Sequence, residues 1–342
     1  MSAGPTEAQV AQAAQALARG ELVAFPTETV YGLGADAEQP QAVRRIYAAK
    51  GRPADHPVIV HVAPEADLAY WSGAVPPQAR QLAQAFWPGP LTLILPRAPH
   101  IDPTVSAGQD SIGLRCPSHP VAQALLRAFA AGKPGGQGGV AAPSANKFGQ
   151  VSPTRAAHVR AEFPDQVAAG MLVLDGGDAQ VGIESTIVDL SRLDRGVGPV
   201  LLRPGHIGAQ ALAQALGMPV SAPDAAAPRV SGSLKAHYAP RTPLAVLDAA
   251  RLQALAQGQG LPAGRSVLVC YEPPSLAPAA AGRLAVRAVP ADPGRYAQSL
   301  YAVLRELDLL GYDRILVQAP PRTPQWEAVN DRIGRAAAAF EG

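Results

Sequence analysis

The stretch from Gln41 to Val62, QAVRRIYAAKGRPADHPVIVHV, decides the fold class. Up to Ala49 its apolar residues recur at helical spacing, whereas Val58–Val62 is a short valine-rich run, as in a buried strand. Gly51 and the prolines after it separate these two parts and require a turn. A helix, a turn and a strand in this order predict an α/β architecture.

The same alternation continues on both sides of this stretch. Besides Val58–Val62, we expect strands at Leu22–Phe25, Leu91–Leu95, Ser111–Arg115, Val140–Ala142, Met171–Leu174, Ser185–Leu190 and Val200–Leu202. We expect helices at Glu7–Arg19, Gln41–Ala49, Pro77–Phe86, Pro120–Ala130 and Thr154–Phe163. Because some of these strands follow one another directly, the sheet is expected to be mixed and twisted rather than purely parallel.

A second, smaller domain is predicted after a linker. Proline, alanine and serine dominate from Met218 to Pro228, where no periodicity remains. A further alternation follows, with strands at Leu244–Leu247, Ser266–Cys270, Leu284–Val289 and Arg314–Gln318, and helices around Ala249–Ala256, Tyr296–Leu310 and Trp326–Phe340. We therefore expect a mixed-sheet domain over residues 7–216, a linker over 217–242 and a Rossmann-like parallel α/β domain over 243–342.

The composition excludes several classes of protein. With 342 residues, 48% of them hydrophobic and 16% charged, the chain can bury a core of its own. A net charge of +2 is too small for the broad basic surface of a dedicated nucleic-acid binder. The N-terminal segment lacks the pattern of a secretory signal, and no run of about 18 apolar residues could span a membrane. We expect a cytoplasmic protein whose Cys116 and Cys270 are buried free thiols rather than zinc ligands.

The turn after the first helix of the opening stretch carries two cations. Lys50 and Arg52 lie on a backbone constrained by glycine and proline, an arrangement that can clamp phosphate without a P-loop. Only four of the 29 basic residues are lysines, so Lys50 stands where this chain ordinarily uses arginine. His61, inside the following strand, is by default a hydrogen-bonded core residue.

The segment from Phe25 to Asp36, FPTETVYGLGAD, offers hydroxyl groups beside glycines. Gly32–Ala37 has the spacing of a dinucleotide-binding turn, but the glycines of that motif directly follow the strand, and here six residues intervene. A loop that holds a small polar substrate through Thr27, Thr29 or Tyr31 fits better. An ordinary polar turn would be favoured if the segment stood alone.

Polar groups also follow other predicted strands. Arg115 closes one strand and is either a surface cap or a fork for a carboxylate that the substrate supplies. Arg203 precedes a helix whose N-terminus favours anions. The cations that could converge on a polyphosphate and a carboxylate are Lys50, Arg52, Arg115, Lys147 and Arg203. The chain has no G-x-S-x-G turn and no H-E-x-x-H pattern, which disfavours serine and metal hydrolase chemistry.

As a set, these segments resemble the YrdC-type threonylcarbamoyl-adenylate synthases. The motifs that carry the resemblance are Pro26-Thr-Glu-Thr-Val-Tyr-Gly-Leu33, Lys50-Gly-Arg-Pro53, Trp87-Pro-Gly-Pro-Leu-Thr92, Gly113-Leu-Arg115, Ala142-Pro-Ser-Ala-Asn146 and Ser185-Thr-Ile-Val-Asp189. The linker sequence His237-Tyr-Ala-Pro240 and the trailing domain are similar to the two-domain form of that family.

The resemblance implies a reaction of L-threonine, bicarbonate and ATP, which gives threonylcarbamoyl-AMP and pyrophosphate for the modification of adenosine in certain tRNAs. Mg²⁺ is expected to arrive with ATP, with no metal ligand assigned to the protein. The implied partners are the downstream tRNA threonylcarbamoyl transferase proteins, together with weak RNA binding, and no membrane.

The resemblance also implies roles for individual residues. Lys50 would lie near the reacting centre as the catalytic cation. Threonine would contact Thr29, His61, Arg115, Ala142 and Ser185. ATP would contact Arg52, His56, Ser111, Ser144, Asn146, Ser152, Arg203 and Tyr238. Since Tyr238 lies in the linker, this segment is expected to fold over the pocket as a lid that keeps water from a labile carbamate.

His56 departs from the family pattern, which usually has asparagine before the proline. If His56 touches phosphate, nucleotide affinity would change with pH near the ordinary imidazole pKa of about 6.5.

Two other functions remain open from the sequence. If the chain is a double-stranded RNA-binding or ribosome-assembly module, its RNA affinity would fall steeply as the salt concentration rises. Adenylate synthesis would instead require all three small substrates. A carbamoyl-transfer maturation enzyme shares the first domain but carries zinc-finger and acylphosphatase-like segments that this sequence lacks.

Overall fold

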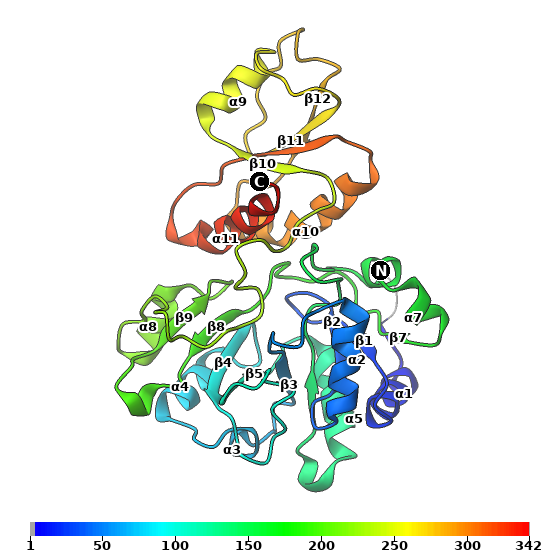
Figure 1. Ribbon diagram of the computed structural model, residues 1–342, viewed down its shortest axis with the longest axis vertical. Coiled ribbons are helices and arrows are strands. Elements are labelled where there is room, and N and C mark those ends of the chain that lie inside the picture. The colour runs from blue at the N-terminus through cyan, green and yellow to red at the C-terminus, as the bar shows by residue number, and fades with distance from the viewer. Residues whose placement is uncertain (1–3, 342) are drawn as a thin grey trace. The chain divides into compact units, whose positions relative to one another are not determined.

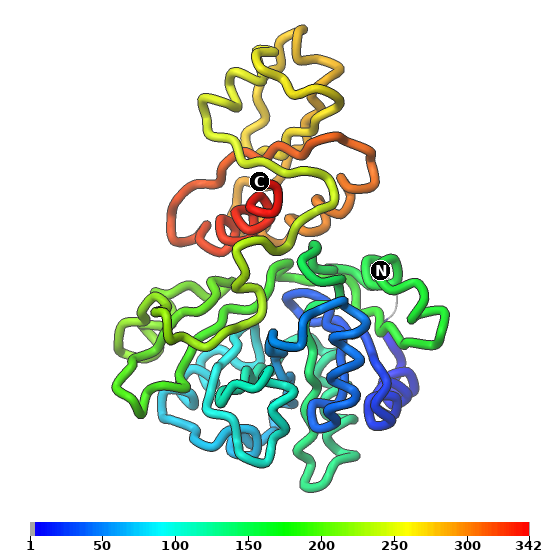
Figure 2. Tube along the Cα trace, in the orientation of Figure 1, coloured from blue at the N-terminus to red at the C-terminus, as the bar shows by residue number. Residues whose placement is uncertain are grey.

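A computed structural model describes residues 4–341 of the chain, which divide into two compact units. Unit 1 contains the described residues up to Phe148 together with Ser152–Ser233. Unit 2 contains Gly149–Val151 and the described chain from Leu234 onward. Figure 1 labels the elements, and Figure 2 follows the course of the chain by colour.

Unit 1 is built on a mixed sheet, as expected. Within residues 4–341 this sheet has nine strands in the order β7-β1-β2-β6-β3-β5-β4-β8-β9. They are β1 (Val23–Phe25), β2 (Gly32–Asp36), β3 (Ile59–Val62), β4 (Leu91–Pro96), β5 (Ser111–Arg115), β6 (Gly139–Ala141), β7 (Leu172–Val173), β8 (Thr186–Asp189) and β9 (Val200–Arg203). The pairs β1–β7, β3–β5 and β4–β8 are parallel and the other neighbouring pairs antiparallel, which confirms the predicted mixed sheet.

The helices of unit 1 begin and end at residues with clear local causes. They are α1 (Glu7–Ala18), α2 (Pro40–Lys50), α3 (Leu68–Trp71), α4 (Pro77–Phe86), α5 (Pro120–Ala131), α6 (Ala156–Glu162), α7 (Pro164–Ala168) and α8 (Ala209–Leu216). Thr6 and Gln9 form a capping box at the start of α1. Helix α2 begins with a proline and ends at Gly51, whose φ of 62° is left-handed, so the chain reverses between Lys50 and Arg52.

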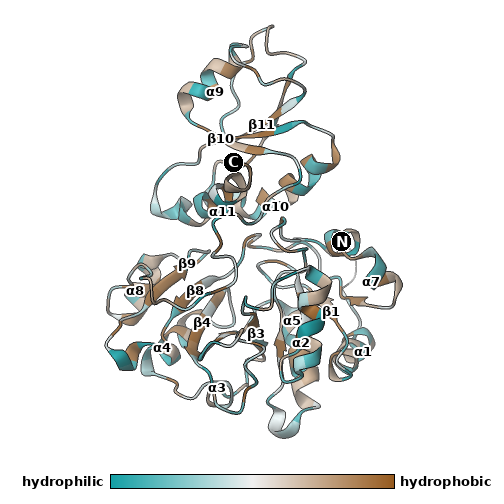
Figure 3. Ribbon diagram, viewed as in Figure 1, coloured by the Kyte–Doolittle hydropathy of each residue, from teal (hydrophilic) through white to brown (hydrophobic). Residues whose placement is uncertain are grey.

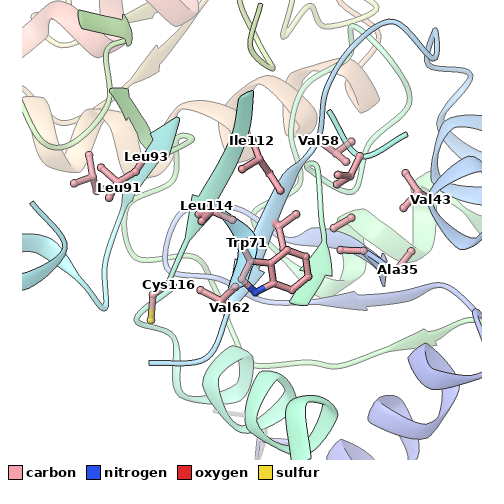
Figure 4. Packing of buried hydrophobic residues seen from close by; sticks show 14 of the residues in the cluster. Ala35, Val43, Val58, Val62, Trp71, Leu91, Leu93, Ile112, Leu114 and Cys116 are labelled. Carbon is pink, nitrogen blue, oxygen red and sulfur yellow. The ribbon is translucent and has the colours of Figure 1, made fainter. Parts of the chain in front are cut away.

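The two faces of the sheet are covered differently. On one face, Leu33, Val60, Leu93 and Leu114 belong to the large core that also contains Trp71. Figure 4 shows the Trp71 ring among strand residues of this core, and Figure 3 shows the apolar character of strands β3 and β4. On the other face, α1 and α5 pack over the β1–β2–β6 side, where residues such as Phe25 and Val140 form a second core. The β3–β5–β4–β8–β9 side of that face carries polar side chains, described below.

The structure corrects the expectation for the glycine-rich segment after Tyr31. Gly32–Asp36 is strand β2, a fully buried inner strand of the sheet, and not part of a substrate loop; nor is it the dinucleotide turn that the sequence already disfavoured. A Cβ at Gly34 would lie 2.8 Å from Phe25 and from Val140, so glycine is needed for close packing. Helix α3, within the same unit, had no counterpart in the sequence-based expectations.

Unit 2 contains a separate parallel sheet. Its strands are β10 (Leu244–Leu247), β11 (Ser266–Cys270), β12 (Leu284–Ala288) and β13 (Arg314–Gln318), and its helices are α9 (Ala249–Ala256), α10 (Pro293–Leu309) and α11 (Glu327–Ala337). The order β10-β13-β11-β12 is parallel throughout, which confirms the predicted Rossmann-like architecture. No helix formed by residues 4–341 is long and apolar enough to cross a membrane.

Candidate active site

Strand register brings the candidate residues of unit 1 onto one face of the sheet. His61 on β3 is directly opposite Arg115 on β5, and Ile59 is opposite Gly113. Because side chains alternate along a strand, Ser111, Gly113 and Arg115 share that face. The register extends this face across the sheet. Gly113 on β5 is opposite Ile94 on β4, and Thr92 on β4 is opposite Ile187 on β8. Ile187 is in turn opposite Arg203 on β9. One face therefore presents these polar groups, while the reverse face is apolar core.

His61 and Arg115 form the part of this face nearest to α5. Both are buried, with 3% and 4% of their surfaces exposed. Burial first, and then the neighbouring guanidinium, lower the pKa of His61 to about 3, so the imidazole is neutral at physiological pH. Its Nδ1 and the Nε of Arg115 have no hydrogen-bond partner among the described residues. Buried polar atoms left in this state call for an explanation, and a bound ligand would supply one.

A hydroxyl-rich group adjoins them across β4, β8 and β9. The Ser185 and Thr92 hydroxyls lie 2.7 Å apart. Arg203 donates to the Ser185 carbonyl at 2.9 and 3.1 Å and to its hydroxyl at 3.1 Å. Thr186 in turn exchanges hydrogen bonds with Ile207, which fixes the segment after Arg203. The guanidinium of Arg203 is thus held rigidly beside Ser185.

An apolar hollow lies between these polar groups and the start of β5. It is bounded by Pro57, Ile59, Ser111, Gly113, Ile94 and Ile187, and by residues 229–231 of the predicted linker. The hollow is shallow and partly open to solvent, and its interior of about 20 Å³ has room for about one water molecule. A floor of isoleucines with a few polar groups at its edge is typical of small-molecule sites.

Lys50 is buried at the end of α2 and connects it to the segment after β6. Its ammonium group donates to the carbonyl groups of Ser144 and Asn146, each at 2.5 Å. Gly32 and Ser144 form an isolated β-bridge, which fixes the same segment against the sheet. Ala142, at the end of β6, is buried and donates its N–H to the Ile59 carbonyl. Lys50 is therefore brought together with Ser144 and Asn146, and the proposed contacts of these residues with the substrates stay predictions.

Arg52 and His56 lie around the ring of Phe148. The Arg52 guanidinium is 5.9 Å from the ring centre and donates to the Pro57 carbonyl, and His56 stacks on the same ring at 5.2 Å. Burial and the charge of Arg52 lower the pKa of His56, while Asp55 opposes this shift. The suggested pH-dependent contact of His56 with phosphate stays a prediction.

Other candidates have partners of their own. Ser152 and Glu184 are both buried and joined by a hydrogen bond of 2.6 Å. The Thr29 hydroxyl lies 2.8 Å from that of Thr27, which also accepts the N–H groups of Thr29 and Val30. The Lys147 ammonium donates to the Ala49 carbonyl and lies 4.8 Å from the centre of the Phe163 ring, so this cation has structural partners.

Tyr238 belongs to unit 2, where its ring lies beside those of His237 and Tyr301 and under the guanidinium of Arg332. Its proposed contact with ATP stays a prediction.

Sequence reasoning missed three polar residues that hold the site. Glu28 binds Arg115, Thr92 pairs with Ser185, and Glu184 accepts from Ser152. Glu28 and Thr92 lie inside motifs already singled out, and Glu184 directly precedes one, but none of the three received a role. A signal was present for Thr92, since it is the polar residue in the apolar run Leu91–Leu95 and so marks a polar spot on one face of that strand.

The sequences of both units match models of known protein families. Residues 15–205 match the family model described as "Telomere recombination" (Sua5, YciO and YrdC), and residues 207–338 match "Threonylcarbamoyl-AMP synthase, C-terminal domain". The threonylcarbamoyl-AMP synthase of Bacillus subtilis is 40% identical, and the match covers 96% of this chain and 93% of the relative. The threonylcarbamoyl-AMP synthase of Schizosaccharomyces pombe is 33% identical, and the match covers 94% of this chain and 86% of the relative.

A solved structure agrees with these matches. The crystal structure of Pyrococcus abyssi Sua5 complexed with L-threonine is 31% identical, covers 98% of this chain and 96% of that chain, and has a TM-score of 0.83. The resemblance inferred from the motifs is thereby confirmed, and the chain belongs to the threonylcarbamoyl-AMP synthase family in its two-domain Sua5 form.

Proposed function

We propose that this enzyme is a nucleotidyltransferase that converts L-threonine, bicarbonate and ATP into threonylcarbamoyl-AMP and pyrophosphate. The observation that supports this most is the shared sheet face, on which a neutral histidine, hydroxyl groups and two arginines lie beside one apolar hollow. Such a face offers separate groups to a zwitterionic amino acid and to a polyphosphate.

The His61–Arg115 part of the face suits threonine. The Arg115 guanidinium is permanently charged and can hold the amino-acid carboxylate, while neutral His61 can share a hydrogen bond with the hydroxyl group without adding charge. Thr29, Ala142 and Ser185 are proposed to complete the threonine contacts. This leaves the amino group free to add to bicarbonate, which forms a carbamate and releases water.

The other part of the face suits the nucleotide. The carbamate oxygen attacks the α-phosphorus and pyrophosphate leaves, so cations are needed where negative charge gathers. Arg203 and Arg52 are proposed to bind the phosphates, with Lys50 at the reacting centre. Further nucleotide contacts are proposed for His56, Ser111, Ser144, Asn146, Ser152 and Tyr238.

Magnesium is proposed to enter on the nucleotide. Between residues 4 and 341 there is no group of three or more His, Cys, Asp or Glu side chains that could hold a metal ion. Mg²⁺ prefers phosphate oxygens and water to an all-protein cage. Bound in this way, the ion would share the charge of the phosphates.

The product is proposed to pass to tRNA threonylcarbamoyl transferase proteins. The double-stranded RNA-binding alternative is not favoured, because the relatives matched over most of their length are synthases.

The proposal is tested by pyrophosphate release from ATP, measured with threonine and bicarbonate omitted in turn. We expect release only when all three substrates are present. Release that continues without threonine or without bicarbonate would reject the proposed reaction.

A further inference from the structure

Glu28 makes a buried ion pair with Arg115. The Nη2 of Arg115 donates to Oε1 of Glu28 at 2.7 Å, and the side chains are only 5% and 4% exposed. The second carboxylate oxygen of Glu28 accepts the Ser118 N–H at 3.1 Å. Both oxygens are therefore occupied by donors from the segment that ends β5 and follows it.

A buried ion pair of this kind often adds little to the free energy of unfolding. Removing two charges from water costs free energy that their attraction repays only with good geometry, and apolar residues of the same volume often serve as well. The pair lies instead at the edge of the polar sheet face. Arg115 has five N–H donors, of which Nε is buried and without a partner among the described residues. The Arg115 guanidinium therefore has N–H donors that its bond to Glu28 does not use, and these can bind another anion.

Glu28 is itself held in place by its neighbours. The Thr27 hydroxyl accepts the N–H groups of Thr29 and Val30 at 3.2 Å, and the Val181 N–H donates to the Glu28 carbonyl at 2.7 Å. The carboxylate therefore projects from a backbone fixed on both sides. Since the guanidinium is planar, a fixed bond to Nη2 also sets the plane in which its remaining donors lie.

We propose that Glu28 is a positioning residue, which presets the Arg115 guanidinium to receive the carboxylate of the amino-acid substrate. The inference rests on the proposed function, since it takes the substrate to be threonine. Glu28 acts through Arg115 and does not touch the substrate. Its loss should therefore weaken amino-acid binding and leave nucleotide binding unchanged.

The test is calorimetric binding of L-threonine, and of L-threoninol, which lacks the carboxylate, to the full chain and to Glu28→Gln. The amide must place an NH₂ group against either Arg115 or the Ser118 N–H, both of them donors, so the pair is disrupted at nearly constant volume. Mutating a residue that orients a metal ligand weakens metal binding, and by analogy we expect the Kd for threonine to rise about tenfold or more. The preference for threonine over threoninol should shrink, and the KM for ATP should stay within about twofold.

Two comparisons separate positioning from a general loss of stability. Glu65→Gln removes the matched Glu–Arg pair with Arg127, which is largely exposed, and should leave threonine affinity unchanged. In a double-mutant cycle, Glu28→Gln should add little to the loss already caused by Arg115→Lys, because both act on one contact. If Glu28→Gln does not fold, Glu28→Asp, which keeps the charge but shortens the reach, should weaken threonine binding in its place.

The outcomes are distinguishable. Failure of the wild-type chain to bind threonine would reject the proposed function itself. A wild-type chain that binds threonine, with an unchanged Kd in the folded Glu28 variants or with equal losses for threonine and ATP, would overturn the positioning role alone.

Discussion

His61 shows how one buried residue determines the charge of the site. It lies on β3 opposite Arg115, and its ring meets the edge of Phe25 at a centroid distance of 6.1 Å. Burial and the adjacent guanidinium hold its pKa near 3, against 6.5 for an exposed histidine. Burial, reinforced by Arg115, thereby keeps the histidine neutral, so the pocket gains a polar group without a second positive charge.

This low pKa predicts a specific dependence of stability on pH. The unfolded chain protonates His61 below pH 6.5, whereas the folded chain does so only near pH 3, so the free energy of unfolding falls as the pH falls through this window. The loss attributable to His61 should be about 1.4 kcal/mol per pH unit below pH 6. In urea unfolding at pH 5.5 and 4.5, the free energy of unfolding should fall less in His61→Gln than in the wild-type chain. Equal slopes in the two proteins would contradict a neutral, buried His61.

At the scale of elements, a short part of the predicted linker covers the apolar hollow of unit 1. Residues 229–231, here called the strap, are held at their first residue by Gln109, whose side chain exchanges two hydrogen bonds with the backbone of Arg229 at 2.8 and 3.0 Å. Val230 packs against Ile94 and Ile187. Arg203 donates to the Ser231 carbonyl at 2.8 Å. The strap therefore uses a donor that the proposed function assigns to phosphate.

Weakening the strap should consequently tighten nucleotide binding. Val230→Ala removes buried methyl groups and, at about 1 kcal/mol, would favour the undocked strap, so the Kd of a non-hydrolysable ATP analogue should decrease by up to about fivefold. Val246→Ala, a change at an exposed position on β10, is the matched control and should have no effect. Unchanged or weaker nucleotide binding in Val230→Ala would show that the strap does not compete with phosphate.

Most elements could be predicted from the sequence, and the failures have physical causes. Apolar runs such as Ser111–Arg115, and proline at a helix start such as Pro77, mark elements whose signal is local. Strand β2 was missed because its glycines have low strand propensity and are required only by the close approach of Phe25 and Val140. The bend of the strap onto the isoleucine floor depends on contacts more than 100 residues apart along the chain, which no local pattern records.

The same distinction holds for the site. The motifs located Arg115, Ser185 and Arg203, because cations and hydroxyl groups near strand ends are visible in the sequence. Their arrangement on one sheet face follows from the register of five strands, which the sequence does not specify. For this reason Glu28, distant in sequence but bonded to Arg115, had no predicted role.

At the scale of the whole molecule, the chain divides its family motifs between two units. The motifs between Pro26 and Asp189 lie in unit 1, whereas His237 and Tyr238 lie in unit 2. In unit 2, Arg305 donates to the Val151 carbonyl, and the Gly149 carbonyl accepts the Ala239 N–H. The segment immediately before Ser152 is therefore packed with the C-terminal unit.

The central claim is that one sheet face of unit 1 binds both an amino acid and a nucleotide. A crystal structure of the full chain with L-threonine and a non-hydrolysable ATP analogue tests it most directly. We predict the threonine carboxylate on Arg115 at about 2.8 Å, with the triphosphate on Arg52 and Arg203. Either ligand bound on another surface, with Arg115 and Arg203 left without ligand contacts, would contradict the account.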